Sequence, residues 1–163
     1  CNQLRKINMF TPDFIDFITL LNKHKVQYML VGGYAVGLHG YPRYTGDLDI
    51  WIQISDTNAT KMLIVLKEFG VNIPDLTKED FLRENPLSGV HFGREPLRID
   101  ILNTIDGVKF EECYPNKQTT VFEGTTIHYI HFNDLKKNKL SSGRTKDKAD
   151  IEELEEKFKK KKK

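Results

Sequence analysis

Hydrophobic and polar residues alternate along two short stretches of this chain, and aspartates stand on the polar side of both. In the first stretch, 47–54, every second residue is aliphatic, and Asp47 and Asp49 occupy positions between them. The second stretch, 97–102, repeats the pattern around Asp100. Because successive side chains of a strand point to opposite faces of a sheet, the alternation predicts two strands, each with a core face and a face that carries carboxylates.

Apolar residues at helical spacing predict several helices around these strands. Thr11 precedes a proline that opens one such run, and Ser55 precedes another run that ends at Gly70, which are typical helix boundaries. A short helix is also expected directly after Gly33. The remaining predictions from this spacing are helices at 12–21, 55–69, 77–83, 132–139 and 145–160.

Further stretches rich in β-branched and aromatic residues complete a small sheet. The predicted strands lie at 27–31, 47–54, 89–93, 97–102, 119–122 and 126–130. We therefore expect an α/β (α+β) fold, with a small mixed β-sheet flanked by helices on one side. The whole chain, 1–163, is expected to be one domain with a core at 26–131 and a C-terminal helical segment at 132–163.

Composition limits the partners that the fold suggests. The formal net charge is +2, but without the five lysines at 159–163 the chain has 20 basic residues against 23 acidic ones. The body is therefore not basic, and charge alone does not predict a polynucleotide substrate. The lysine run is either an arm that attracts RNA or the solvated end of a helix.

No stretch resembles a membrane span or a signal peptide, so no membrane partner and a cytoplasmic location are expected.

Asp47 and Asp49 indicate chemistry because two carboxylates on one face of a strand repel one another. A nearby cation or an added proton relieves this repulsion. Mg²⁺ suits the spacing, since it prefers oxygen ligands and commonly lies between carboxylates and phosphates. Asp100 joins the pair if its strand is a neighbour. Gly32 and Gly33, between a strand and a helix, allow the backbone to approach a phosphate closely.

The order of these residues resembles the nucleotidyltransferase (polymerase-β-like) superfamily, particularly small bacterial members related to the AbiEii toxins. The resemblance consists of Gly32-Gly33, the run R-x-T-x-D-x-D at 43–49, and a later single aspartate on a strand. It covers residues 28–102. Tyr34 follows the two glycines where the superfamily commonly has serine.

The resemblance implies a catalytic site at the three aspartates. Asp47, Asp49 and Asp100 correspond to the carboxylates that bind two Mg²⁺ or Mn²⁺ ions in the superfamily. The implied reaction moves a nucleoside monophosphate from a nucleoside triphosphate (NTP) to a hydroxyl group. Gly32 and Gly33 then lie beneath the phosphates.

Further residues are implied to bind the nucleotide. Arg43 and Thr45 match the R-x-T that precedes the acidic pair, although Arg43 could equally pair with a surface acid. The segment 144–150 is similar to one that follows the sheet in the AbiEii-like group, which places Lys146 at the NTP. The alternative for Lys146 is an ion pair with Asp150, four residues later on one helix.

The acceptor of the nucleotide stays open between a tRNA, a protein and a small molecule. Resemblance to toxins also implies a toxin–antitoxin role, with an antitoxin protein as partner. The alternative function is a non-catalytic nucleotide- or partner-binding module that retains the fold. Trp51 shares the face of the aspartates and either stacks on a base or packs beneath a helix.

Overall fold

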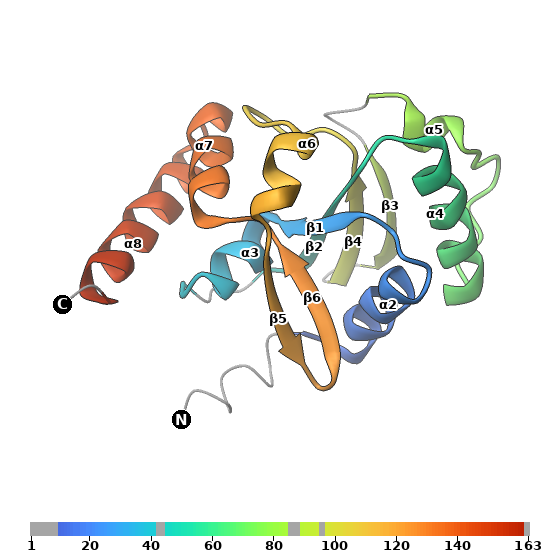
Figure 1. Cartoon of the computed structure of the whole chain (residues 1–163), viewed down its shortest axis with the longest axis horizontal. Helices are drawn as coiled ribbons and strands as arrows, with labels where there is room; N and C mark the ends of the chain where they lie inside the picture. Colours follow the sequence, from blue (N-terminus) through green and yellow to red (C-terminus); the bar gives the residue numbers. More distant parts are fainter. Residues whose placement is uncertain (1–9, 42–44, 85–88, 95–96, 162–163) are drawn as a thin grey trace.

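A mixed β-sheet forms the centre of the protein (Figure 1). The computed structural model describes residues 10–41, 45–84, 89–94 and 97–161. Within these residues, six strands lie in the order β3-β4-β2-β1-β6-β5. Their bounds are β1 Tyr28–Val31, β2 Asp47–Ile52, β3 Val90–Arg94, β4 Leu97–Leu102, β5 Gln118–Phe122 and β6 Thr125–Tyr129. The predicted α/β class and all the predicted strands are confirmed.

The helices begin and end largely where the sequence predicts. Thr11 and Ser55 cap α2 and α4, because each hydroxyl accepts a hydrogen bond from a backbone N–H three residues later, at 3.3 Å and 3.1 Å. Gly70 ends α4 with a left-handed φ of 90°. The helices are α2 Pro12–Lys23, α3 Gly32–Leu38, α4 Asp56–Phe69, α5 Glu79–Leu82, α6 Phe110–Cys113, α7 Phe132–Ser142 and α8 Thr145–Lys161, with a 3-10 turn at Tyr114–Asn116.

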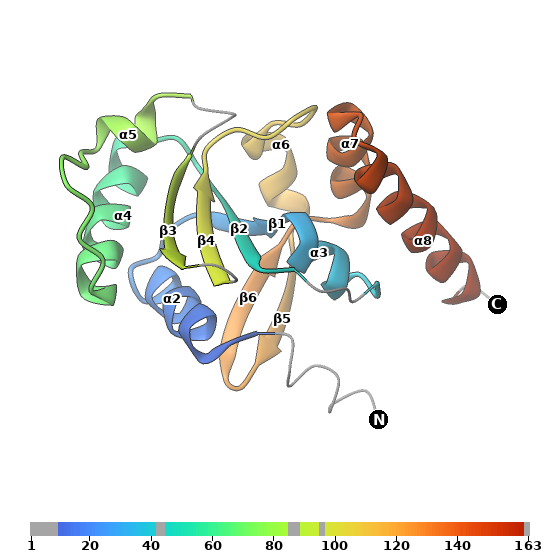
Figure 2. The same ribbon diagram turned by 180° about the vertical axis from the view of Figure 1, so that it is seen from behind.

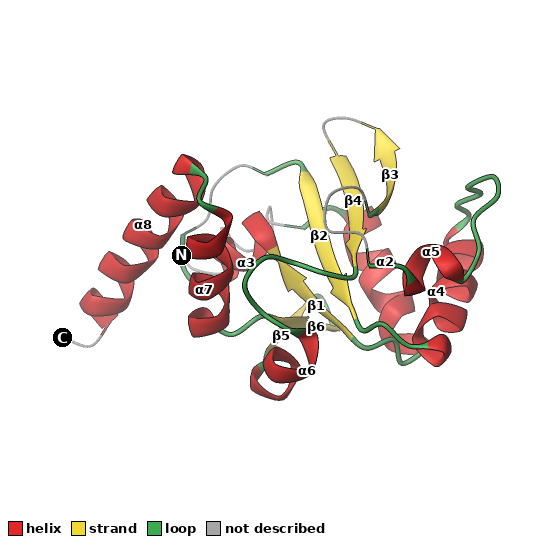
Figure 3. Ribbon diagram, turned by 90° about the horizontal axis from the view of Figure 1, so that it is seen from above, coloured by secondary structure: helices red, strands yellow, loops and turns green. Residues whose placement is uncertain are grey.

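Helices cover both faces of the sheet, so the prediction of helices on one side is wrong. On one face, α2 and α4 pack on the aliphatic residues of β1, β2 and β4. On the other, Met29, Val31 and Trp51 form a second core with side chains of α3, α6, α7 and α8. Figures 2 and 3 show the two sets of helices on either side of the strands. The sheet face that carries the aspartates therefore also carries apolar residues, and helices bury the part of that face where the apolar residues lie.

Trp51 belongs to this second core. Its side chain is buried, and its ring meets the ring of Phe110 edge to face at 5.2 Å. The indole N–H donates to the carbonyl oxygen of Asn103 at 3.2 Å. Of the two alternatives for Trp51, packing beneath a helix is therefore the observed one. That helix, α6, is only one turn long and has no hydrophobic repeat that would predict it.

The two C-terminal helices pack on each other and beside α3 (Figure 1). The break between them lies at Gly143, whose φ is 69°. Lys157 of α8 donates to the carbonyl oxygen of Gly40 at 2.5 Å and lies over the ring of Tyr41. None of the helices in the described part of the chain is both long and apolar enough to cross a membrane.

Candidate functional site

The pairing of β2 with β4 brings the three predicted carboxylates together. The two strands are parallel neighbours, and Asp49 lies opposite Asp100 in the register. Asp47 lies opposite Arg98, two residues earlier on each strand. Since residues two apart on a strand share a face, all four side chains lie on the face that α3, α7 and α8 cover farther along. The sequence prediction that Asp100 joins the acidic pair is consistent with this register.

The two glycines of the predicted turn lie directly beside these residues. Gly32 has a φ of 66°, and a Cβ atom at this position would lie 2.1 Å from Oδ2 of Asp49. A Cβ on Gly33 would lie 2.9 Å from Oγ1 of Thr45. Real Cβ atoms do not approach other atoms as closely as the first distance. The structure therefore gives the glycines a role that the sequence did not suggest: they make room for the side chains of Asp49 and Thr45.

Asp49 is in an environment that disfavours its charge. Burial raises its pKa from an ordinary 3.8 to about 7, and the charges of Asp100 and Asp47 and a hydrogen bond with Asp100 act in the same direction. Lys139 acts against this shift. Because the negative neighbours of Asp49 outweigh the effect of Lys139, a cation that reaches this carboxylate would be bound favourably.

Arg98 supplies positive charge to the other two carboxylates. Its Nε lies 2.9 Å from Oδ1 of Asp100, and its Nη2 lies 3.1 Å from Oδ2 of the same residue. Nη2 also lies 3.4 Å from Oδ2 of Asp47. The sequence prediction treated Arg98 only as an alternating strand residue. Its position two residues before Asp100 was the available signal, since that spacing puts both on one face.

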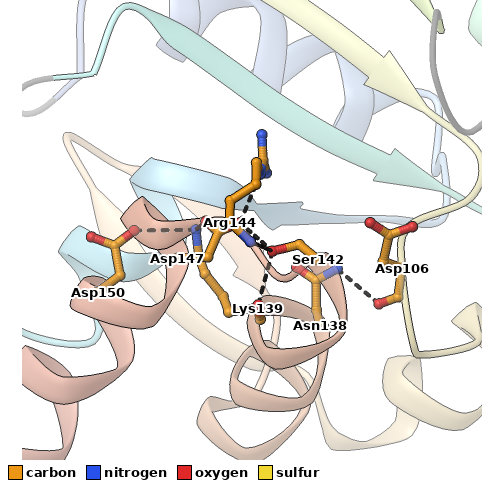
Figure 4. Close-up of polar contacts among 7 residues, drawn as sticks. All are labelled: Asp106, Asn138, Lys139, Ser142, Arg144, Asp147 and Asp150. Atoms are coloured by element: carbon orange, nitrogen blue, oxygen red, sulfur yellow. Dashed lines mark hydrogen bonds and ion pairs between the residues drawn. The ribbon is translucent and has the colours of Figure 1, made fainter.

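Lys139 is a second residue that sequence reasoning missed (Figure 4). This lysine is buried, and its Nζ lies 2.8 Å from Oδ1 of Asp147 and 3.3 Å from Oδ2 of Asp150. Burial alone would raise the pKa of Asp147, but hydrogen bonds from Lys139, Ser142 and Arg144 outweigh it and hold that pKa below its ordinary value. No local pattern pointed to Lys139, because the two carboxylates that pair with it lie on the next helix.

The structure describes two of the other three residues predicted to bind the nucleotide. Arg43 lies outside the described residues. Thr45 lies against Gly33, and its hydroxyl donates to the carbonyl oxygen of Asp47 at 3.4 Å. Lys146 is exposed in the first turn of α8, while Asp150, its alternative partner, binds Lys139. The role of Lys146 at the NTP stays a prediction.

The carboxylates fit a divalent metal ion in chemistry, though they are not arranged around one. Within 10–41, 45–84, 89–94 and 97–161, no group of three or more histidine, cysteine, aspartate or glutamate side chains is placed to hold a metal ion. The guanidinium that joins Asp47 to Asp100 is a physical reason for this. The donors themselves are oxygen atoms only, which suits Mg²⁺ or Mn²⁺. The excess negative charge at Asp49 also favours such an ion.

Comparisons with known proteins add no family to this description. A scan of the chain against protein-family models found no match, and a search of curated proteins found none. The interpretation of the site therefore rests on the residues and on their geometry.

Gly32→Ala is expected to destabilise the protein by at least about 2 kcal/mol, since a left-handed φ and an overlap each cost about 1–2 kcal/mol. The overlap is with Asp49, so the double variant with Asp49→Ala should recover the part that the clash contributes. Gly143→Ala is the matched control, because Gly143 has a similar φ of 69° and no atom within 4 Å of an added Cβ. Denaturant unfolding measures all four proteins. Equal losses for Gly32→Ala and Gly143→Ala would contradict the close approach of Asp49.

Asp49→Asn should stabilise the metal-free protein more at high pH than at low pH. A folded-state pKa above the unfolded value means that the stability from this group is complete below about pH 4 and declines as the pH rises through about 7. The decline can reach about 1.4 kcal/mol for each pH unit between the two pKa values. Asparagine does not titrate, so its advantage over aspartate should grow over this range and then level off. Unfolding of both proteins in chelator across the range measures it, and a constant difference would contradict the raised pKa.

Proposed function

We propose that this protein is a metal-dependent nucleotidyltransferase, which moves a nucleoside monophosphate from an NTP to a hydroxyl acceptor. The observation that supports the proposal is the register of β2 and β4, which places Asp49 opposite Asp100 and Asp47 on the same face. The adjoining turn at Gly32 and Gly33 lies against the same residues.

In this proposal, Asp47, Asp49 and Asp100 would hold two divalent ions. Mg²⁺ or Mn²⁺, when bound, supplies positive charge that neutralises the carboxylates and the triphosphate and stabilises the reacting oxygens. Asp100 accepts the proton of the acceptor hydroxyl. The acceptor oxygen then forms a bond to the α-phosphorus, the bond from that phosphorus to the bridging oxygen breaks, and pyrophosphate leaves.

Basic residues on the C-terminal helices complete the proposed site. Lys139 is fixed by Asp147 and Asp150 and contributes positive potential at Asp49. It therefore offsets part of the negative charge that a triphosphate would otherwise meet. Lys146 and Arg43 are proposed to contact the triphosphate directly, Lys146 as a point charge and Arg43 through its planar fork.

The acceptor is proposed to be a tRNA, a protein or a small molecule, and the biological role that of the toxin in a toxin–antitoxin pair with a protein antitoxin. The competing function is a non-catalytic nucleotide- or partner-binding module. The ion pairs of Arg98 favour that alternative, because they already neutralise part of the carboxylate cluster. Binding and transfer experiments separate the two functions.

Calorimetric titration with each NTP in Mg²⁺ or Mn²⁺ tests the proposal. The parent protein should bind one or more NTPs only with metal, and Asp49→Asn should lose that binding, since it removes a carboxylate ligand but keeps the side-chain shape. Asp16→Asn, at an exposed position of α2, is the control and should bind like the parent.

Labelled NTPs incubated with RNA, protein and cell extract then identify the acceptor. Nucleotide binding without any transfer would favour the binding module, and no metal-dependent binding would remove the proposed function.

Lys146→Met should weaken NTP binding several-fold if its ammonium reaches the triphosphate, since one attraction between unlike charges is lost. The change should leave stability almost unaltered, because Lys146 is exposed. Lys148→Met is the matched control, an exposed lysine two residues later on α8. The same titration and a thermal melt measure all three proteins. Equal affinities in the parent and both variants would exclude Lys146 from the site.

A further inference from the structure

The guanidinium of Arg98 occupies the position between Asp100 and Asp47 that a bound metal ion would be expected to take. The guanidinium meets both oxygens of Asp100, at 2.9 Å and 3.1 Å, and reaches Oδ2 of Asp47 at 3.4 Å. A guanidinium that contacts both oxygens of a carboxylate, as a fork does, holds the carboxylate in place and offsets its negative charge. One positively charged side chain therefore contacts two of the three residues proposed to hold the metal and offsets part of their charge.

A divalent ion and this guanidinium cannot use the same carboxylates without repelling each other. Two like charges a few ångströms apart near a protein surface repel each other about as strongly as two unlike charges there attract. Binding of the ion would therefore require that the guanidinium leave Asp100 and Asp47. The backbone of Arg98 is held by a hydrogen bond from its N–H to the carbonyl oxygen of Gly46 at 2.9 Å, so the side chain is the part that would move.

Two features of the structure bear on whether the Arg98 side chain can move. The residue opposite Arg98 on the neighbouring strand β3 is Gly93, which has no side chain on that face. The Arg98 side chain is also about one third exposed, at 36%. Competition with a metal ion would require the guanidinium to turn from the carboxylates toward its solvent-exposed side while β4 keeps its register.

We propose that Arg98 is a resident counter-cation, which holds the carboxylate cluster together without metal and competes with the divalent ion for Asp47 and Asp100. This inference rests on the proposed function for the identity of the ligands, and it makes Arg98 a positioning residue that sets metal affinity. Its signature is unusual, because loss of the arginine should improve binding of a cation.

Titration of Mn²⁺ into nucleotide-free protein tests the competition. Arg98→Met should bind Mn²⁺ at least about tenfold more tightly than the parent, since a like charge is removed from the site. Arg98→Lys keeps the charge but loses the fork, so its affinity should lie between the two. Arg144→Met is the matched control, because Arg144 pairs with Asp147 outside the three proposed metal ligands, and it should leave Mn²⁺ affinity unchanged. Thermal melts should show that Arg98→Met loses stability without metal and gains more from Mn²⁺ than the parent does.

Equal or weaker Mn²⁺ binding by both Arg98 variants would overturn the inference. If Arg98→Met does not fold, the comparison of Arg98→Lys with the parent decides, and equal affinities there reject it. If the parent protein binds Mn²⁺ but no NTP, the proposed function is rejected, while the competition between Arg98 and the metal ion can still be measured. A parent and variants that all bind no metal overturn the competition itself.

Discussion

Repulsion among three carboxylates is the constraint on which this structure depends. The register of β2 and β4 forces Asp49 and Asp100 to lie opposite each other, and Asp47 shares their face. The protein offsets the repulsion unequally, because Arg98 pairs with Asp47 and Asp100 while the pKa of Asp49 rises to about 7. Such an arrangement is costly for stability alone, which is why it supports a binding or catalytic role.

Local patterns were sufficient to predict most of the fold. Alternation located β2 and β4, and the hydroxyls of Thr11 and Ser55 located the starts of α2 and α4. Each of these predictions depends on residues close together in the sequence. Alternation also put Asp47 and Asp49 on one face and Asp100 on the polar face of its own strand, but only the pairing of β2 with β4 brings the three together.

The parts that sequence could not predict depend on contacts between distant residues. Met29 and Val31 read as ordinary strand residues and Trp51 had two possible roles, and only the helices opposite them show that this face is a second core. Lys139 reads as one lysine of a basic stretch, but its burial depends on Asp147 and Asp150 of the next helix. Gly32 suggested a ligand contact, whereas the atom that approaches it belongs to Asp49. In all three cases the partner lies on another element, which no local pattern specifies.

The anchoring of Lys139 by α8 also has a consequence for the order in which the site is assembled during synthesis. The ribosome makes the strands that carry the aspartates first and Asp147 and Asp150 much later. Until α8 has emerged and docked, Lys139 lacks the two carboxylates that fix its ammonium, and Asp49 lacks a fixed positive neighbour. Lys157 then joins α8 to Gly40, just before the segment that leads into β2. The strands that carry the aspartates are thus made before the residues that complete the charge balance around them.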